Sequence, residues 1–437
     1  MISRSCFAFV LLGVAATAAE AAEPPTLNTG STAWMITAAV LVLFMCLPGL
    51  ALFYGGLVRA KNMLSLFTQC FGIAGLIGVL WAIYGYSLVV DSTGMVEGQV
   101  SFNSFVGGLS KAFLSGMTPD SLVGDIPEGV FVTFQMTFAI ITPALIAGAF
   151  AERMKFSAAL LFMAVWFTLV YAPIAHMVWG GAGALMHNWG VLDFAGGTAV
   201  HINAGVAALV ACLMLGKRKG YPHTPMPPHN LCLAMVGAAM LWVGWFGFNI
   251  GSAGGLSGLS GMVMINTQLG ACAGVVGWLL TEWLKAGRPS ALGLASGALA
   301  GLVGITPACA YVGVGGALAI GLLCGVCCYL SVTVMKQRLG YDDTLDVFGL
   351  HGVGGIIGAV LTGVFCVPTL GGLVEGVDMT TQVVAQLKGV GFTFVYCFVG
   401  SWIILKGVKA VTGLRAHDAI EELGLDLGEH NERAYNH

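Results

Sequence analysis

Long apolar segments alternate with short polar ones along most of the chain. Eleven apolar segments reach the length of about 20 residues that a membrane-crossing helix needs. They cover residues 32–57, 64–90, 127–150, 157–177, 194–215, 231–250, 259–283, 290–306, 310–334, 345–367 and 383–411. Transmembrane strands are about half as long, and the bilayer requires every backbone polar group to be hydrogen-bonded, so segments of this length form helices. The pattern predicts an all-α integral membrane protein with eleven transmembrane helices.

The composition supports this class and narrows the partners. Of the 437 residues, 57% are hydrophobic and only 9% are charged, whereas a soluble protein carries about 25% charged residues. The 64 glycines are typical of helices that pack closely in a membrane. The net charge is −3 and there is no basic run, so we expect membrane lipid, and not nucleic acid, as a partner.

The twelve cysteines are scattered through apolar segments, where cysteine acts as a small hydrophobic residue. Cys324 and Cys327 form a C-x-x-C pattern inside a predicted helix, with no histidine or acid nearby. A reactive thiolate needs an electropositive setting. We therefore favour helix packing over a redox or metal site here, and expect no metal and no cofactor.

The two ends of the chain differ from its middle. Residues 1–21 have the pattern of a secretory signal peptide, because a basic Arg4 precedes a short apolar run and a small-x-small cleavage site at 19–21. An uncleaved anchor is the alternative interpretation. The remaining chain divides into an eleven-helix domain, residues 22–412, and a charged cytoplasmic tail, residues 413–437, that is too short for a domain.

Lysine and arginine residues gather in alternate loops of the predicted bundle. They are Arg59, Lys61, Arg153, Lys155, Lys217, Arg218, Lys219, Lys285, Arg288, Lys336 and Arg338, with Lys111 as the clear exception. Basic residues favour cytoplasmic loops. The pattern predicts a multi-pass protein of the inner membrane with its N-terminus in the periplasm and its C-terminus in the cytoplasm.

A basic, proline-rich loop at 216–230 separates the first five predicted helices from the next five. Because five is an odd number, two such halves run in opposite directions across the membrane, which is the inverted-repeat plan of many transporters. The eleventh helix stands outside the repeat.

Each half carries an acid followed eight residues later by a histidine: Asp193 with His201, and Asp343 with His351. Eight residues of helix rise about 12 Å, so an acid at either surface places its histidine near the middle of the membrane. Ionisable groups inside a membrane are costly and indicate a functional site. We predict that His201 and His351 share a hydrogen bond in one pore, in preference to two unrelated buried histidines. A metal site lacks a third ligand.

Asp193 opens an apolar, glycine-rich helix. Its carboxylate either caps the backbone N–H groups of that helix or binds a cation directly, and the position at a helix start favours the cap.

Aromatic residues cluster near the predicted outer ends of three helices. Phe134 and Phe138 are four residues apart and share one helix face. Trp179 follows the fourth helix, while Trp245, Phe248 and Ser252 end the sixth. Each alone is typical of the aromatic belts of membrane proteins. Together, Trp179, Phe138 and Ser252 form a candidate cage of ring faces and one hydroxyl, which attracts cations.

These segments together resemble the Amt branch of the Amt/Mep/Rh family of ammonium transporters. The matching stretches are 48–56, 151–153, 176–181, 193–203, 244–254, 301–308 and 342–352, and they span nearly the whole chain after residue 21. The resemblance implies eleven helices, a homotrimer with one pore per subunit and a periplasmic N-terminus. It also implies that the tail contacts a PII-type signal-transduction protein.

The resemblance assigns roles to matching positions. Trp179, Phe138 and Ser252 form the ammonium recruitment site, and Phe138 with Phe248 forms a gate below it. His201 and His351 are the pore and proton-relay pair, and Asp193 is structural or electrostatic. The remaining vestibule residues are Phe134, Trp245 and Thr306.

The sequence therefore predicts a transporter, not an enzyme, that captures ammonium, deprotonates it and conducts ammonia through an apolar pore. The alternative is an ammonium sensor with little flux. A neutral-gas channel of the Rh type is disfavoured by Trp179 and Phe138, and an intramembrane enzyme lacks a nucleophile–base pair.

Overall fold

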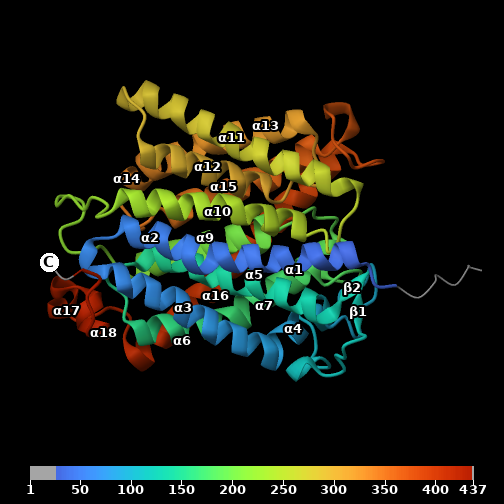
Figure 1. The fold of residues 1–437 in the computed structure, drawn as a ribbon, viewed down its shortest axis with the longest axis horizontal. Helices are drawn as coiled ribbons and strands as arrows, with labels where there is room; N and C mark the ends of the chain where they lie inside the picture. Colours follow the sequence, from blue (N-terminus) through green and yellow to red (C-terminus); the bar gives the residue numbers. More distant parts are fainter. Residues whose placement is uncertain (1–25, 436–437) are drawn as a thin grey trace, which may run out of the picture.

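The computed structural model describes residues 26–435, so the predicted signal peptide, residues 1–21, lies outside the described residues. Long helices run side by side along the longest axis of the molecule (Figure 1). One end carries helices α17 (Asp418–Leu423) and α18 (Leu425–His430), and we call it the tail end. The opposite end carries the segment 91–127 with the short strands β1 (Leu122–Val123) and β2 (Ile126–Pro127), and we call it the loop end.

The first half of the bundle contains spans that combine α-helix with short 3₁₀ or π segments. They are α1 (Thr29–Phe44), η1 (Met45–Leu50) and α2 (Ala51–Leu57); η2 (Ala60–Asn62), α3 (Met63–Leu80), η3 (Trp81–Gly85) and α4 (Tyr86–Val90); α5 (Glu128–Phe150); α6 (Phe156–Trp166), η6 (Phe167–Tyr171) and α7 (Ala172–Trp179); and η7 (Gly197–Ile202) with α9 (Asn203–Leu215).

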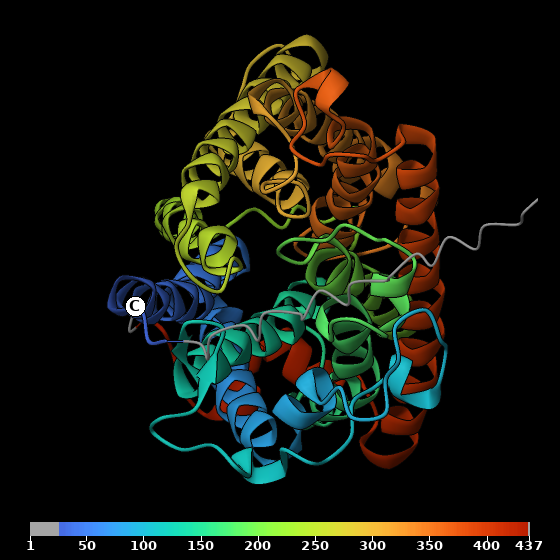
Figure 2. The ribbon, with the colours of Figure 1, turned by 90° about the vertical axis from the view of Figure 1, so that its right-hand side faces the viewer.

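The second half contains long α-helices and two π segments, η8 and η9. Its elements are α10 (Leu231–Gly251), α11 (Gly258–Ala286), α12 (Ala291–Ile305), α13 (Val314–Leu330), η8 (Ser331–Met335), α14 (Lys336–Leu339), η9 (Phe348–Gly352), α15 (Val353–Phe365) and α16 (Met379–Thr412). Short elements in the connections are η4 (Phe102–Ser104), η5 (Ala112–Leu114), α8 (Leu185–Asn188) and η10 (Pro368–Leu370). Seen from the loop end, the two halves lie on opposite sides of the bundle, and α16 runs along one edge (Figure 2).

The all-α membrane class is confirmed. Within residues 26–435, ten helices are long and apolar enough to cross a membrane, and α12 is a shorter apolar helix of 15 residues. These helices overlap the eleven predicted segments, while eleven crossings and the inverted repeat stay predictions. The helices of the two histidines begin three residues later than predicted, at Gly197 and Phe348. The reason is local: Gly196 has φ 110° and Asp346 has φ 60°, so each helix follows a residue in the left-handed region.

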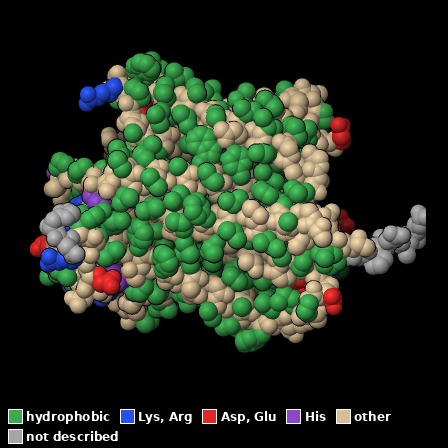
Figure 3. Space-filling model, viewed as in Figure 1, with side chains coloured by type: hydrophobic (Ala, Val, Ile, Leu, Met, Phe, Trp, Pro, Cys, Tyr) green, Lys and Arg blue, Asp and Glu red, His purple; other side chains and the backbone are tan. Residues whose placement is uncertain are grey.

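The surface shows a membrane-facing character. On the face in Figure 3, hydrophobic side chains cover the middle of the molecule, and the visible Lys and Arg side chains lie at the tail end. Over the whole surface, large apolar side chains such as Val79, Leu280 and Ile403 are about half exposed. An exposed apolar belt of this extent fits a multi-pass membrane protein.

The tail folds back onto the tail end of the bundle. The Asp426 carboxylate accepts the backbone N–H groups of Leu64 (3.0 Å) and Ser65 (2.7 Å), at the start of α3. Arg415 forms an ion pair with Glu421 at 2.8 Å, and the Ala416 N–H donates to the Arg153 carbonyl at 2.9 Å. The tail is therefore a packed part of this surface.

A buried ion network joins the loops at the same end. Glu152 pairs with Arg59 at 2.7 Å and with Arg218 at 3.3 Å, and Arg218 also pairs with Asp342 at 2.8 Å. Burial opposes ionisation of both carboxyls, but the arginine hydrogen bonds and charges outweigh it and hold the pKa values of Glu152 and Asp342 below their ordinary range. The loops that start and end the central helices are thus tied together.

The helices that carry the two histidines cross at a pair of glycines. A Cβ atom on Gly205 would lie 2.3 Å from the backbone nitrogen of Gly352 and 2.4 Å from its Cα. No side chain fits between two backbones at that distance. This contact therefore fixes how near α9 comes to the junction of η9 and α15.

We expect Gly205→Ala to destabilise the protein, because the added methyl group meets backbone and cannot be relieved by a side-chain rotation. Overpacking of this kind costs about 1–3 kcal/mol. Thermal unfolding in detergent measures the effect. Gly391→Ala in α16 is the matched control, since a Cβ there meets nothing within 4 Å, and its unfolding midpoint should stay unchanged or rise. Equal midpoints for the two variants would contradict the role of the crossing.

Candidate functional site

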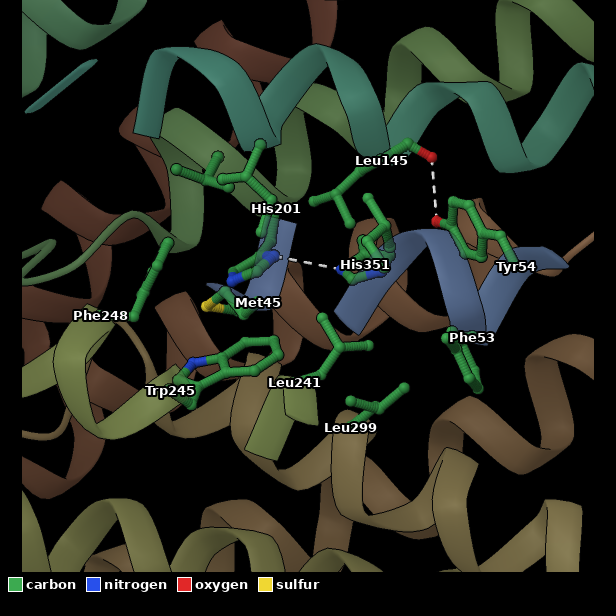
Figure 4. Close-up of a pocket in the computed structure, with 13 residues that line it drawn as sticks. Met45, Phe53, Tyr54, Leu145, His201, Leu241, Trp245, Phe248, Leu299 and His351 are labelled. Carbon is green, nitrogen blue, oxygen red and sulfur yellow. Dashed lines mark hydrogen bonds between the residues drawn. The ribbon is translucent and has the colours of Figure 1, made fainter. Parts of the chain in front are cut away.

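Two histidines face each other in the middle of the bundle, one from each π-helical segment. The Nδ1 atoms of His201 (η7) and His351 (η9) are 3.1 Å apart, and the rings lie nearly parallel, 5.2 Å between centroids (Figure 4). One Nδ1 must donate and the other accept, so the neutral pair holds two different tautomers. The π-helical geometry was not expected from the sequence, although π segments recur at functional sites.

The second nitrogen of His201 is available for a guest. His201 Nε2 is buried and has no hydrogen-bond partner in the described part of the chain. Depending on the tautomer, this atom offers either a hydrogen or a lone pair. A buried polar atom without a partner is uncommon and calls for an explanation such as a bound molecule.

The rings line a narrow apolar cavity. Its volume is about 10 Å³, at the lower limit for holding one water molecule. Besides the histidines, the lining residues are Met45, Leu50, Phe53, Tyr54, Ile141, Leu145, Val200, Leu241, Trp245, Phe248 and Leu299. The Tyr54 hydroxyl is already engaged, since it donates to the Leu145 carbonyl at 3.0 Å (Figure 4). The cavity therefore offers a small guest little polar contact other than the imidazoles.

Trp245 supports His201 from one side. Its ring stacks on the imidazole with 5.5 Å between centroids and an 18° angle. The indole Nε1 donates to the Thr306 hydroxyl at 2.8 Å, and that hydroxyl donates to the Leu302 carbonyl at 2.7 Å. The sequence placed Trp245 and Thr306 near the outer vestibule, whereas the structure sets Trp245 deeper, against His201, and buries Thr306 behind it.

An aromatic stack separates this cavity from the loop end. Phe138 and Phe248 are stacked with 4.1 Å between centroids, and both are buried. Phe248 also lies 6.1 Å from the His201 ring. Phe134 is fully buried behind Phe138 at 5.0 Å. Phe248 lines the cavity, and Phe138 lies between Phe248 and Trp179.

Trp179 lies beyond the stack and is half-buried. Its ring meets Phe138 edge-on, with 5.9 Å between centroids. Ser252 follows α10, and its hydroxyl donates to the Phe248 carbonyl at 2.9 Å. The structure thus brings Trp179, Phe138 and Phe248 together directly, while Ser252 joins the group through the backbone of Phe248.

The Asp193 carboxylate caps the start of η7. It accepts the backbone N–H groups of Gly196 (2.9 Å), Gly197 (2.6 Å) and Thr198 (2.7 Å), and it also accepts the Thr198 hydroxyl. Its backbone carbonyl accepts the Trp179 indole N–H at 3.1 Å. Asp193 is therefore occupied as a helix cap and also anchors Trp179.

Asp343 has the corresponding place before η9 but makes fewer contacts. One oxygen accepts the Phe348 N–H at 2.7 Å, and the other has no partner within residues 26–435. Burial and the neighbouring Asp346 raise the pKa of Asp343 to about 6, against the lowering effect of Lys336. Asp346 itself pairs with Lys336 at 2.6 Å.

A second, wider cavity of about 310 Å³ lies toward the tail end. Phe53 lines both cavities, so it stands between them. Carboxyl, hydroxyl and aromatic groups line the wider one, including Glu282, Asp346, Ser296 and Trp278. Sequence reasoning did not single out Phe53 or Tyr54, although both lie in the 48–56 stretch that carried the family resemblance.

Within residues 26–435, no group of three or more His, Cys, Asp or Glu side chains is arranged to hold a metal ion. Cys324 and Cys327 are free thiols in α13. The chemistry available at the site is therefore that of imidazole pairs, ring faces and one unpartnered nitrogen in an apolar cavity.

Comparison with known proteins identifies the family. Residues 33–435 match the sequence model of the Ammonium Transporter Family. The ammonium transporter of Aquifex aeolicus is 46% identical over 433 residues, covering 98% of this chain and 99% of that protein. The ammonium transporter of Bacillus subtilis is 44% identical over 416 residues, covering 94% and 99%.

Comparison with solved structures gives the same family. The crystal structure of Candida albicans Mep2 has a TM-score of 0.80 and 35% identity, covering 90% of this chain and 88% of that chain. A structure named Sensor Amt Protein has a TM-score of 0.83 and 29% identity, covering 91% and 98%. Together with the paired histidines in an apolar cavity, these matches show that the chain belongs to the ammonium transporter family.

Proposed function

We propose that this protein captures ammonium at the loop end, removes a proton and conducts ammonia past His201 and His351 to the tail end. The observation that carries the proposal is the imidazole pair in a cavity that is otherwise apolar and about as large as one water molecule. In this proposal the loop end faces the periplasm, the tail end faces the cytoplasm, and the protein lies in the inner membrane. That orientation rests on the basic residues at the tail end.

The cavity favours a neutral guest over a cation. A charge near the centre of a bilayer costs at least about 2.5–3.5 kcal/mol, even on the lenient insertion scale. Ammonia avoids this cost, and the free Nε2 of His201 replaces part of its lost hydrogen bonding. Potassium has no proton to leave behind, so the same cavity excludes it.

Capture is assigned to Trp179, Phe138 and Ser252. Two ring faces and a hydroxyl attract a small cation by about 0.5–2 kcal/mol. Asp193 adds its negative charge nearby through the cap and holds the Trp179 indole. Passage then requires the stacked pair Phe138 and Phe248 to separate, so these rings act as the gate.

The hydrogen bond between the histidines gives a route for the proton. In such a relay a proton adds to the bare Nε2 of His201, the Nδ1 proton of His201 passes to Nδ1 of His351, and His351 releases its Nε2 proton towards the tail end, so that each ring ends in its other tautomer. Currents from proteoliposomes on a solid support, after an ammonium pulse, test this step. A current supports the relay, and its absence at a measurable ammonia flux refutes net charge movement.

A second candidate is an ammonium sensor with little flux. The specific observation in its favour is the likeness to the structure named Sensor Amt Protein. The closed aromatic stack also fits a receptor that binds ammonium at the loop end without passing it on.

For the assembled state we propose a homotrimer with one pore per subunit, and docking of a PII-type protein on the tail end. The packed tail, with Asp426 on the start of α3 and Ala416 on Arg153, gives such a partner a surface connected to the pore loops.

In a strain that lacks its own ammonium transporters, we expect the protein to support methylammonium uptake and not potassium uptake. His351→Ala should lower methylammonium uptake at least tenfold, because the cavity loses half of its polar lining. If the native protein is present in the membrane but gives no more methylammonium uptake than an empty vector, the result would favour the sensor. Equal potassium uptake would refute the apolar-pore mechanism.

We expect Trp179→Leu to raise the KM for ammonium by about 2- to 30-fold, which corresponds to the 0.5–2 kcal/mol of a ring face on a cation. The maximal rate should change less, because the histidine cavity is untouched. Trp189→Leu is the matched control, since Trp189 is equally half-buried at the loop end but packs on Phe392. A similar KM for both variants would remove Trp179 from the capture site.

Deletion of residues 413–437 should abolish co-purification with PII protein if the tail forms part of the docking surface. Because the deletion also removes the cap on α3, Asp426→Asn serves as the milder variant. Unchanged co-purification after the deletion would show that the tail is not needed.

A further inference from the structure

His176 lies in the last turn of α7, three residues before Trp179, and is fully buried. Its ring lies between α7, the end of α4 and the short helix η4. Nδ1 is 2.8 Å from the Val89 carbonyl oxygen at the end of α4. Nε2 is 2.8 Å from the Asn103 carbonyl oxygen in η4. Both are distances of good hydrogen bonds.

The two partners fix the number of ring protons. A carbonyl oxygen accepts hydrogen bonds and cannot donate them. A neutral imidazole has one N–H and one bare nitrogen, so it would satisfy one carbonyl and place a lone pair against the other. Only the imidazolium, with hydrogen on both nitrogens, satisfies both contacts.

The surroundings suit a cation. Val89 lies in the last turn of α4, where carbonyl groups have no partner within the helix. His176 itself lies in the last turn of α7, and its own carbonyl accepts the Gly180 N–H at 2.7 Å. The carboxyl-terminal ends of two helices therefore point their negative dipole ends at one ring.

The neighbouring charged groups are engaged with other partners. Asp91, after α4, accepts the N–H groups of Thr93 and Ser110, both at 3.0 Å. Glu128, at the start of α5, accepts the Tyr86 hydroxyl at 3.0 Å and pairs with Lys111. Other ionisable side chains on the segments around α7 are Tyr171 in η6, His187 in α8, Glu97 and Asp120 in the 91–121 segment and Asp193 before η7.

We propose that His176 is a doubly protonated positioning residue that ties α4 and the 91–121 segment to the helix end carrying Trp179, so that ammonium capture depends on the pH at the loop end. The transport part of this inference rests on the proposed function. Loss of one ring proton breaks one of the two carbonyl contacts. The 91–121 segment or the end of α4 is then released, and Trp179 loses part of its support.

The first test does not need transport. In protein with ¹⁵N-labelled histidine, the His176 signals are identified by their absence from His176→Gln. At pH 7 we expect hydrogen on both ring nitrogens. A ring with one bare nitrogen at that pH would overturn the proposal. Hydrogen exchange of residues 91–110 should accelerate about tenfold as the pH rises to 9, after correction for intrinsic exchange, because a charge-assisted hydrogen bond is lost.

The second test uses transport and matched variants. The glutamine amide of His176→Gln donates hydrogen but does not titrate, so folding is kept while the switch is removed. From external pH 6 to 9, we expect the KM for ammonium to rise several-fold in the native protein and to stay flat in His176→Gln. His187→Gln removes an exposed histidine of the same end and should behave like the native protein. A pH dependence of KM that persists in His176→Gln would overturn the proposal, whereas absence of all transport would instead refute the proposed function.

Discussion

The close crossing of two helices at Gly205 and Gly352 is the contact on which the rest of the site depends. His201 lies four residues before Gly205, and His351 immediately precedes Gly352. With the backbones in contact, the two imidazoles lie 3.1 Å apart at Nδ1. A side chain at Gly205 would overlap the backbone of Gly352, and relief of that overlap would move apart the helices that carry the two rings. The glycine-rich composition therefore serves geometry here, because it lets two polar side chains meet inside an apolar bundle.

An aspartate precedes each of these two helices, but the two carboxylates do not accept the same number of hydrogen bonds. Asp193 is saturated by the N–H groups of η7 and a threonine hydroxyl. Asp343 accepts one N–H and leaves its other oxygen unpaired in a buried place. The partly satisfied, buried Asp343 has a raised pKa. The two helix starts therefore differ in how completely their acids are hydrogen-bonded.

Much of the fold followed from the sequence because hydrophobic length is a strong signal in membranes. The spacing from acid to histidine also predicted that His201 and His351 meet. Other features depend on backbone geometry that no residue pattern announces. The left-handed Gly196 and Asp346 delay both helices by three residues, and the two histidines lie on the π segments η7 and η9 that follow. Trp245 was expected in the outer vestibule, from its place near the end of the sixth predicted segment, and the structure stacks its ring on His201.

The histidines of this chain show how hydrogen-bond partners set chemical roles. His201 and His351 bond to each other, so one donates, one accepts, and the neutral pair can reverse its direction. His176 lies between two carbonyl oxygens, which accept and cannot donate, so each ring nitrogen satisfies its contact only by donating. The first arrangement suits a lining that passes a neutral guest or a proton, since no net charge is stored there. The second suits an anchor at the membrane surface, where a helix end stabilises the charge. In the proposed mechanism, the same side chain therefore serves conduction in the middle of the bundle and positioning at its edge.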